Sequence, residues 1–172
     1  MQSENTEVLG LVIHSGEPVF LTLVGLHVIA GIAAVIAGLA AMFSRKVKGA
    51  HPIWGTAYFW AIVSIVGAAA ILTMLRGPDD WPVLALGVGA LACAWVGRSA
   101  RRGRWNNSIR VHIAGMGLSY VLALTAFYVE TGDQLPLWRA LPHLLYWILP
   151  ASLGLPLIVR ALMRHSPVRR SG

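Results

Sequence analysis

Five long apolar runs constrain the fold of this sequence more than any other feature. Short charged or Gly/Pro-containing connections separate them, and they cover residues 19–43, 53–75, 82–96, 109–129, and from 137 or 142 to 163. A helix needs about 20 mainly apolar residues to cross the hydrocarbon core of a bilayer. The pattern therefore predicts an all-α integral membrane bundle of five transmembrane helices.

Composition supports this class, because 56% of the 172 residues are hydrophobic and only 12% are charged. A soluble domain of this length normally carries about twice that share of charged residues. The chain shows neither an internal repeat nor a linker long enough to separate domains. We expect one helical domain over residues 18–163, an outer-face tail at 1–17 with an interfacial segment at 8–13, and a basic tail at 164–172.

Basic residues are concentrated in three parts of the chain. Twelve of the fourteen lie after the first run, after the third run or at the end of the chain, and they are Arg45, Lys46, Lys48, Arg98, Arg101, Arg102, Arg104, Arg110, Arg160, Arg164, Arg169 and Arg170. All seven acidic residues lie in the N-terminal tail or in the other two loops. Excess Lys and Arg mark the cytoplasmic face. The partition predicts that the N-terminus lies outside and the C-terminus in the cytoplasm.

The third run is short for a span. Its helix must stand nearly upright, use residues toward Ala100, or thin the bilayer locally, and a re-entrant segment is the alternative. A third segment that did not cross would place two strongly basic loops on opposite sides of the membrane. The charge partition therefore favours a crossing helix.

The net charge of +7 belongs to short membrane-flanking segments, so it indicates no nucleic-acid partner and is explained by membrane lipids. The acidic N-terminus does not have the form of a cleavable signal peptide. Cys93 is the single cysteine, which excludes a disulfide within the chain, CxxC chemistry and covalent c-type haem attachment. A noncovalent cofactor remains open.

Four of the six histidines, His27, His51, His112 and His143, lie inside or at the mouths of the apolar runs. An ionisable side chain in a bilayer is by default a candidate functional residue. With the predicted orientation, His27 and His143 lie toward the outer side, and His51 and His112 toward the inner side. This predicts two pairs, His27 with His143 and His51 with His112, in planes separated by roughly 20 Å.

Two histidines from facing helices can hold a haem iron six-coordinate for electron transfer. At this point the chain resembles the transmembrane b-type di-haem cytochromes in architecture, with histidines on helices one, two, four and five and helix three peripheral. The resemblance implies two haem b cofactors with all four histidines as iron ligands. It also implies electron transfer between an outer and an inner haem, with a quinone or a redox protein as partner; a homo-oligomer is left open.

Glycines follow three of these histidines by three or four residues, on the same helical face: Gly31, Gly55 and Gly115. A missing side chain beside a histidine makes room for a flat ligand. The alternative is that these glycines are helix-packing positions, as in many membrane helices.

Haem propionates prefer basic partners near the membrane surface. The candidates are Arg139 and Arg76 on the outer side and Lys48 and Arg110 on the inner side. The alternative is that these side chains are snorkelling anchors.

Other assignments stay open. His14 could replace His143, and Met116 could supply a thioether to a His/Met or copper site. A second hypothesis is a cofactor-free multi-pass protein whose histidines serve packing, metal binding or proton-coupled transport. The spans contain no carboxylate of the kind that transporters often carry, which favours the cofactor.

The stretch GLAAMFSRKVKGAHPIWGTAYFW, residues 38–60, is similar to the first hairpin of a family of bacterial predicted membrane proteins of unknown function. The likeness extends from the first run to the end of the fifth. It implies a small multi-pass helical protein of the bacterial inner membrane, and it implies no particular activity.

Overall fold

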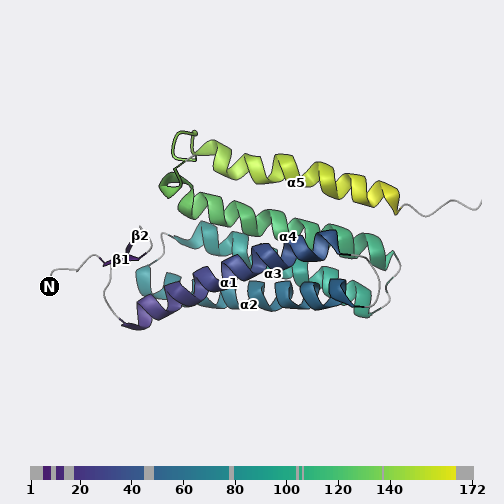
Figure 1. Cartoon of the computed structure of the whole chain (residues 1–172), viewed down its shortest axis with the longest axis horizontal. Helices are drawn as coiled ribbons and strands as arrows, with labels where there is room; N and C mark the ends of the chain where they lie inside the picture. Colours follow the sequence, from purple (N-terminus) through teal and green to yellow (C-terminus); the bar gives the residue numbers. More distant parts are fainter. Residues whose placement is uncertain are drawn as a thin grey trace, which may run out of the picture. The chain divides into compact units, whose positions relative to one another are not determined.

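A computed structural model describes residues 6–8, 11–13, 18–44, 49–77, 80–103, 105, 107–136 and 138–165. Five α-helices follow one another along the chain (Figure 1), and they are α1 (Pro18–Phe43), α2 (Ala50–Arg76), α3 (Trp81–Arg102), α4 (Ser108–Thr131) and α5 (Leu144–Arg164). All five are long and apolar enough to cross a membrane. This confirms the predicted all-α class with five helices that could each span a membrane, as a multi-pass membrane protein requires.

The ends of the helices follow from local backbone chemistry. α1 begins at Pro18, whose fixed φ suits the first turn of a helix. Gly49 before α2 has φ 130° and Gly77 after it has φ 108°, which residues with a Cβ rarely adopt. The Gly77 N–H donates to the Thr73 carbonyl at 2.9 Å and closes the last turn.

α3 is a single helix of 22 residues that continues six residues past the predicted end at 96. At 1.5 Å per residue it is about 33 Å long, enough to cross. It therefore uses the residues toward Ala100, one of the solutions that the short apolar run allowed. Arg101 and Arg102 lie in its last turn, where a positive charge interacts favourably with the helix dipole.

α5 begins at Leu144, close to the later of its two predicted starts. The Leu145 N–H donates to the Pro142 carbonyl at 2.8 Å, so Pro142 opens this helix. Pro150 and Pro156 lie inside α5 and remove two backbone donors from it.

A two-stranded hairpin and a short 3-10 helix complete the described chain. The strands β1 (Thr6–Val8) and β2 (Leu11–Ile13) pair antiparallel, with Glu7 opposite Val12. Residues 8 and 11–13 of the predicted interfacial segment lie in these strands, and residues 9 and 10 lie outside the described residues. The 3-10 helix η2 (Gly132–Gln134) follows α4 directly.

The chain forms two compact units, Met1–Leu84 and Ala85–Gly172, and each is described by itself. The first holds the hairpin of α1 and α2, which pack along each other (Figure 1). The buried positions of α1 include small residues, and those of α2 include larger ones: Ala30, Ala34 and Ala37 on α1, and Tyr58, Phe59, Ile62 and Val66 on α2. Small side chains let one helix backbone approach another closely in a membrane.

The second unit holds most of α3 together with α4 and α5. α3 and α4 cross at Gly97 and Gly115, where a Cβ atom on Gly115 would lie 2.8 Å from the Gly97 Cα. α4 and α5 run antiparallel, with Gly117 facing Ile158 and Gly132 facing Tyr146. Glycines thus lie at the close contacts within this unit.

Candidate functional site

His51 lies in the first turn of α2 and reaches back to the end of α1. Its Nδ1 atom is 2.8 Å from the carbonyl oxygen of Ala41. α1 ends at Phe43, so this carbonyl is one of the last four of the helix. A carbonyl can only accept, so Nδ1 carries the proton, and the lone pair of the neutral ring is on Nε2.

His112 makes the same kind of bond in the second unit. Its Nδ1 atom lies 3.0 Å from the carbonyl oxygen of Gly97 in α3. By the same reasoning Nδ1 is the donor, and the neutral ring has its lone pair on Nε2. Because Gly97 is also the point of closest approach to Gly115, His112 ties α4 to α3 where their backbones touch.

His27 is half-buried in α1, and its ring interacts with the backbone of Ile65 in α2. Its Nδ1 atom is buried and has no hydrogen-bond partner. Among the side chains that the structure describes, this is the one buried nitrogen or oxygen atom without a partner. Such atoms are uncommon in folded proteins, and each calls for an explanation, such as a bound ligand or an ordered water.

His143 is exposed and directly precedes α5. Its ring stands edge-on to Tyr146, with centroids 5.3 Å apart. Tyr146 is buried and donates its hydroxyl to the Trp138 carbonyl at 3.0 Å, and the ring of Trp138 packs 4.2 Å from that of Tyr128. His143 therefore lies beside an aromatic cluster that holds the connection between α4 and α5.

Neither unit brings its own two histidines together. In the first unit His27 lies level with Ile65 and His51 with Ala41, and the 14 residues from 27 to 41 rise about 21 Å along α1. In the second unit His112 is one turn into α4, whereas His143 begins α5 beside the opposite end of α4. Each predicted pair takes one histidine from each unit, so the two pairs stay predictions.

The three glycines near the histidines differ in their surroundings. A Cβ atom added to Gly31 or Gly55 would meet nothing within 4 Å. A Cβ atom on Gly115 would lie 2.7 Å from the Cys93 carbonyl oxygen and 2.8 Å from the Gly97 nitrogen. The space beside His112 that the sequence offered to a flat ligand is thus filled by the backbone of α3, and Gly115 is a helix-packing position.

The four candidate propionate partners are described only in part. Arg139 is exposed in the connection between α4 and α5. Its backbone N–H donates to the Leu135 carbonyl at 3.0 Å. Arg110 is half-buried in the first turn of α4. Arg76 ends α2, but its side chain and all of Lys48 lie outside the described residues.

The alternative ligands give no second cluster. His14 lies outside the described residues, and Met116 packs against Gly97, whose added Cβ would lie 3.2 Å from the Met116 Cγ. Within the described ranges, the structure has no group of three or more His, Cys, Asp or Glu side chains placed to hold a metal ion.

Gly97 is a residue that sequence reasoning missed, although a signal for it exists. Ala90, Ala94, Gly97 and Ala100 are all buried on α3 and recur every three or four residues. This spacing places small residues along one helical face and is typical of close helix packing in membranes.

Comparison with protein families, curated proteins and solved structures finds no match for this chain.

Proposed function

We propose that this chain is a b-type cytochrome of the bacterial inner membrane that transfers electrons between an outer and an inner haem. The observation that carries the proposal is that His51 and His112 each donate Nδ1–H to a backbone carbonyl of the neighbouring helix. Histidines that bind a metal through one ring nitrogen commonly donate the other N–H in this way, which fixes the tautomer and the ring orientation. Both rings then have their basic lone pair on Nε2.

His27 supports the outer site. A buried imidazole nitrogen without a hydrogen-bond partner is energetically unfavourable. A bound group would supply a partner or change the environment of this nitrogen. In the proposed arrangement His27 and His143 hold the outer haem, and His51 and His112 hold the inner one. Haem supplies a one-electron redox centre when bound, and a quinone or a redox protein exchanges electrons with it.

The other candidate residues position and orient the two haems in this proposal. Arg139 and Arg76 are the proposed candidates for the outer propionates, and Arg110 and Lys48 are those for the inner ones. Gly31 and Gly55 leave open space on the faces that carry His27 and His51. The excess of basic residues after α1, after α3 and at the end of the chain supports an orientation with the C-terminus in the cytoplasm and the N-terminus outside.

An absorption spectrum before and after reduction with dithionite tests the proposal. The full chain is expressed with added haem precursor, purified in detergent and compared with His51→Ala, His112→Ala and His165→Ala. His165 is the matched control, because its Nδ1 bonds a carbonyl of its own helix, that of Ala161, at 2.9 Å on the exposed end of α5.

We expect a Soret band in the unchanged protein and in His165→Ala. His51→Ala and His112→Ala should each lose the same haem component, at unchanged helicity in circular dichroism. A haem-replete preparation without a Soret band would refute the proposal. Loss of all haem in any one variant would indicate a single site instead of two.

A second candidate is a cofactor-free membrane protein in which these histidines only join helices. The position of the Ala41 carbonyl favours it, because this carbonyl lies in the last turn of α1 and the bond from His51 joins that turn to α2. In that case no preparation shows a Soret band, whereas His51→Ala and His112→Ala still lower the melting temperature.

A further inference from the structure

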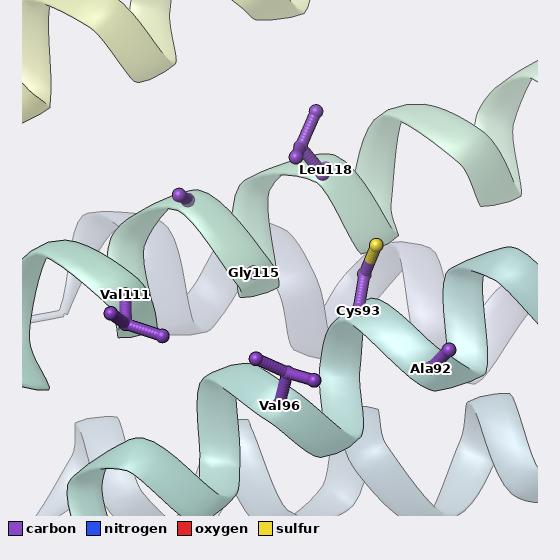
Figure 2. Close-up of a pocket in the computed structure, with 7 residues that line it drawn as sticks. Ala92, Cys93, Val96, Val111, Gly115 and Leu118 are labelled. Atoms are coloured by element: carbon purple, nitrogen blue, oxygen red, sulfur yellow. The ribbon is translucent and has the colours of Figure 1, made fainter. Parts of the chain in front are cut away.

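An open apolar groove of about 370 Å³ runs between α3 and α4 in the second unit. Figure 2 shows its walls, which are Ala92, Cys93 and Val96 from α3 and Val111, Ala114, Gly115 and Leu118 from α4. Gly115, one of the lining residues, also lies where the backbones of α3 and α4 approach each other closely. The histidines of the proposed haem sites do not line it.

The groove leads from the middle of the two spans toward one end of the unit. α3 and α4 run antiparallel, since Gly89 faces Leu122 and Gly97 faces Met116. The end of α3 and the start of α4 therefore lie at the same level. Val111, which lines the groove, directly follows Arg110 in the first turn of α4.

This end of the unit is positively charged. Arg101 and Arg102 are exposed at the end of α3, and Arg110 is half-buried at the start of α4. The antiparallel packing of α5 on α4 brings Arg164 to the same end. The sequence has no Asp or Glu between Asp80 and Glu130, and Glu130 lies at the opposite end of α4.

We propose that this groove binds one acyl chain of an anionic phospholipid whose phosphate lies at Arg110. The walls are apolar and belong to two membrane-spanning helices, so a hydrocarbon chain matches their chemistry. Arginine binds phosphate oxygens through charge-assisted hydrogen bonds, and basic pockets between transmembrane helices bind anionic head groups. In a protein that holds haem, this inference assigns Arg110 to the lipid phosphate and leaves Lys48 as the inner propionate partner. It holds for a cofactor-free protein as well.

Native mass spectrometry of the full chain tests this inference. The detergent-solubilised protein is equilibrated with phosphatidylglycerol and phosphatidylcholine that carry the same acyl chains. We expect retention of phosphatidylglycerol over phosphatidylcholine, and a loss of about fivefold in that preference in Arg110→Gln, as one surface charge contributes. Arg110→Lys should keep most of the preference, and Arg160→Gln, an exposed position of α5, is the matched charge control.

The apolar part is tested by Ala92→Leu, which fills the groove, against Ala85→Leu at another exposed alanine of α3. We expect Ala92→Leu alone to reduce lipid retention. A phosphatidylglycerol with a diazirine in its chain should crosslink within residues 92–96 and 111–118. Circular dichroism and size-exclusion chromatography confirm that each variant is folded.

Three results would overturn the inference. Equal losses in Arg110→Gln and Arg160→Gln would indicate diffuse attraction to the basic surface. Crosslinks spread evenly over the five helices would indicate general solvation by lipid. A dimer that dissociates only in Ala92→Leu, without a lipid preference, would mean that a second copy of the chain occupies the groove.

Discussion

Three of the four histidines in or beside the spans interact with the backbone of a neighbouring helix. His27 contacts Ile65, His51 contacts Ala41 and His112 contacts Gly97. In hydrocarbon there is no water to pair with a polar group, so such contacts matter more than on a wet surface. At the scale of single residues, these rings therefore have a structural role whether or not they also bind iron.

Replacement of His51 by Ala should lower the stability of the protein, because it removes the hydrogen bond between His51 Nδ1 and the Ala41 carbonyl at the end of α1. The expected loss is about 1 kcal/mol, the usual net contribution of one hydrogen bond. The melting temperature in detergent, followed by circular dichroism, measures it. His165→Ala should leave the melting temperature almost unchanged, because that bond lies on an exposed helix end; equal shifts in both variants would contradict the assignment.

At the scale of helices, α3 and α4 are held by backbone contact instead of large interlocking side chains. The atoms that meet near Gly115 are the Cys93 carbonyl and the Gly97 backbone, and neither can move aside alone. α3 also shows how far the sequence determines an element. Its apolar core is evident, but its end is not, because Arg98, Arg101 and Arg102 can snorkel and let the helix continue.

Gly115→Ala should destabilise the protein by about 1–3 kcal/mol, the usual range for overpacking of a tight interior. Gly31→Ala is the matched control, since its added Cβ meets nothing within 4 Å. Alanine is the better helix former by up to about 1 kcal/mol, so this variant should be neutral or more stable. Thermal unfolding of the two variants in the same detergent measures the difference in stability. A Gly115→Ala protein as stable as Gly31→Ala would contradict the close backbone contact at Gly115.

At the scale of the whole molecule, charge is distributed by side. Within the second unit the basic ends of α3 and α5 lie level with the start of α4, whereas Glu130 and Asp133 lie at its other end. This is the distribution that the positive-inside rule associates with a defined orientation.

The orientation is tested with single cysteines introduced in a Cys93→Ser background. Ala50→Cys at the start of α2 and Gln134→Cys in η2 are both exposed positions. On intact cells a membrane-impermeant maleimide should label Gln134→Cys, because the proposed orientation keeps the basic connections in the cytoplasm and puts η2 outside. Ala50→Cys should react only after the membrane is permeabilised, and the reverse pattern would contradict the proposed orientation.

The sequence by itself determined the class of this protein, its five spans and the level of His27 and His51 on their helices. Span length and flanking charge are local properties, since the bilayer sets the same length and charge requirements for each segment separately. Histidines within apolar runs could also be identified without a structure, because they are chemically out of place there.

Only the tertiary structure decided what surrounds those residues. Gly31, Gly55 and Gly115 follow histidines at almost the same spacing, yet a neighbouring helix fills the space at Gly115 alone. The tautomers of His51 and His112 likewise depend on carbonyls 10 and 15 residues away in the chain. Spacing along one helix specifies a face, whereas the occupant of that face is set by the packing of another helix.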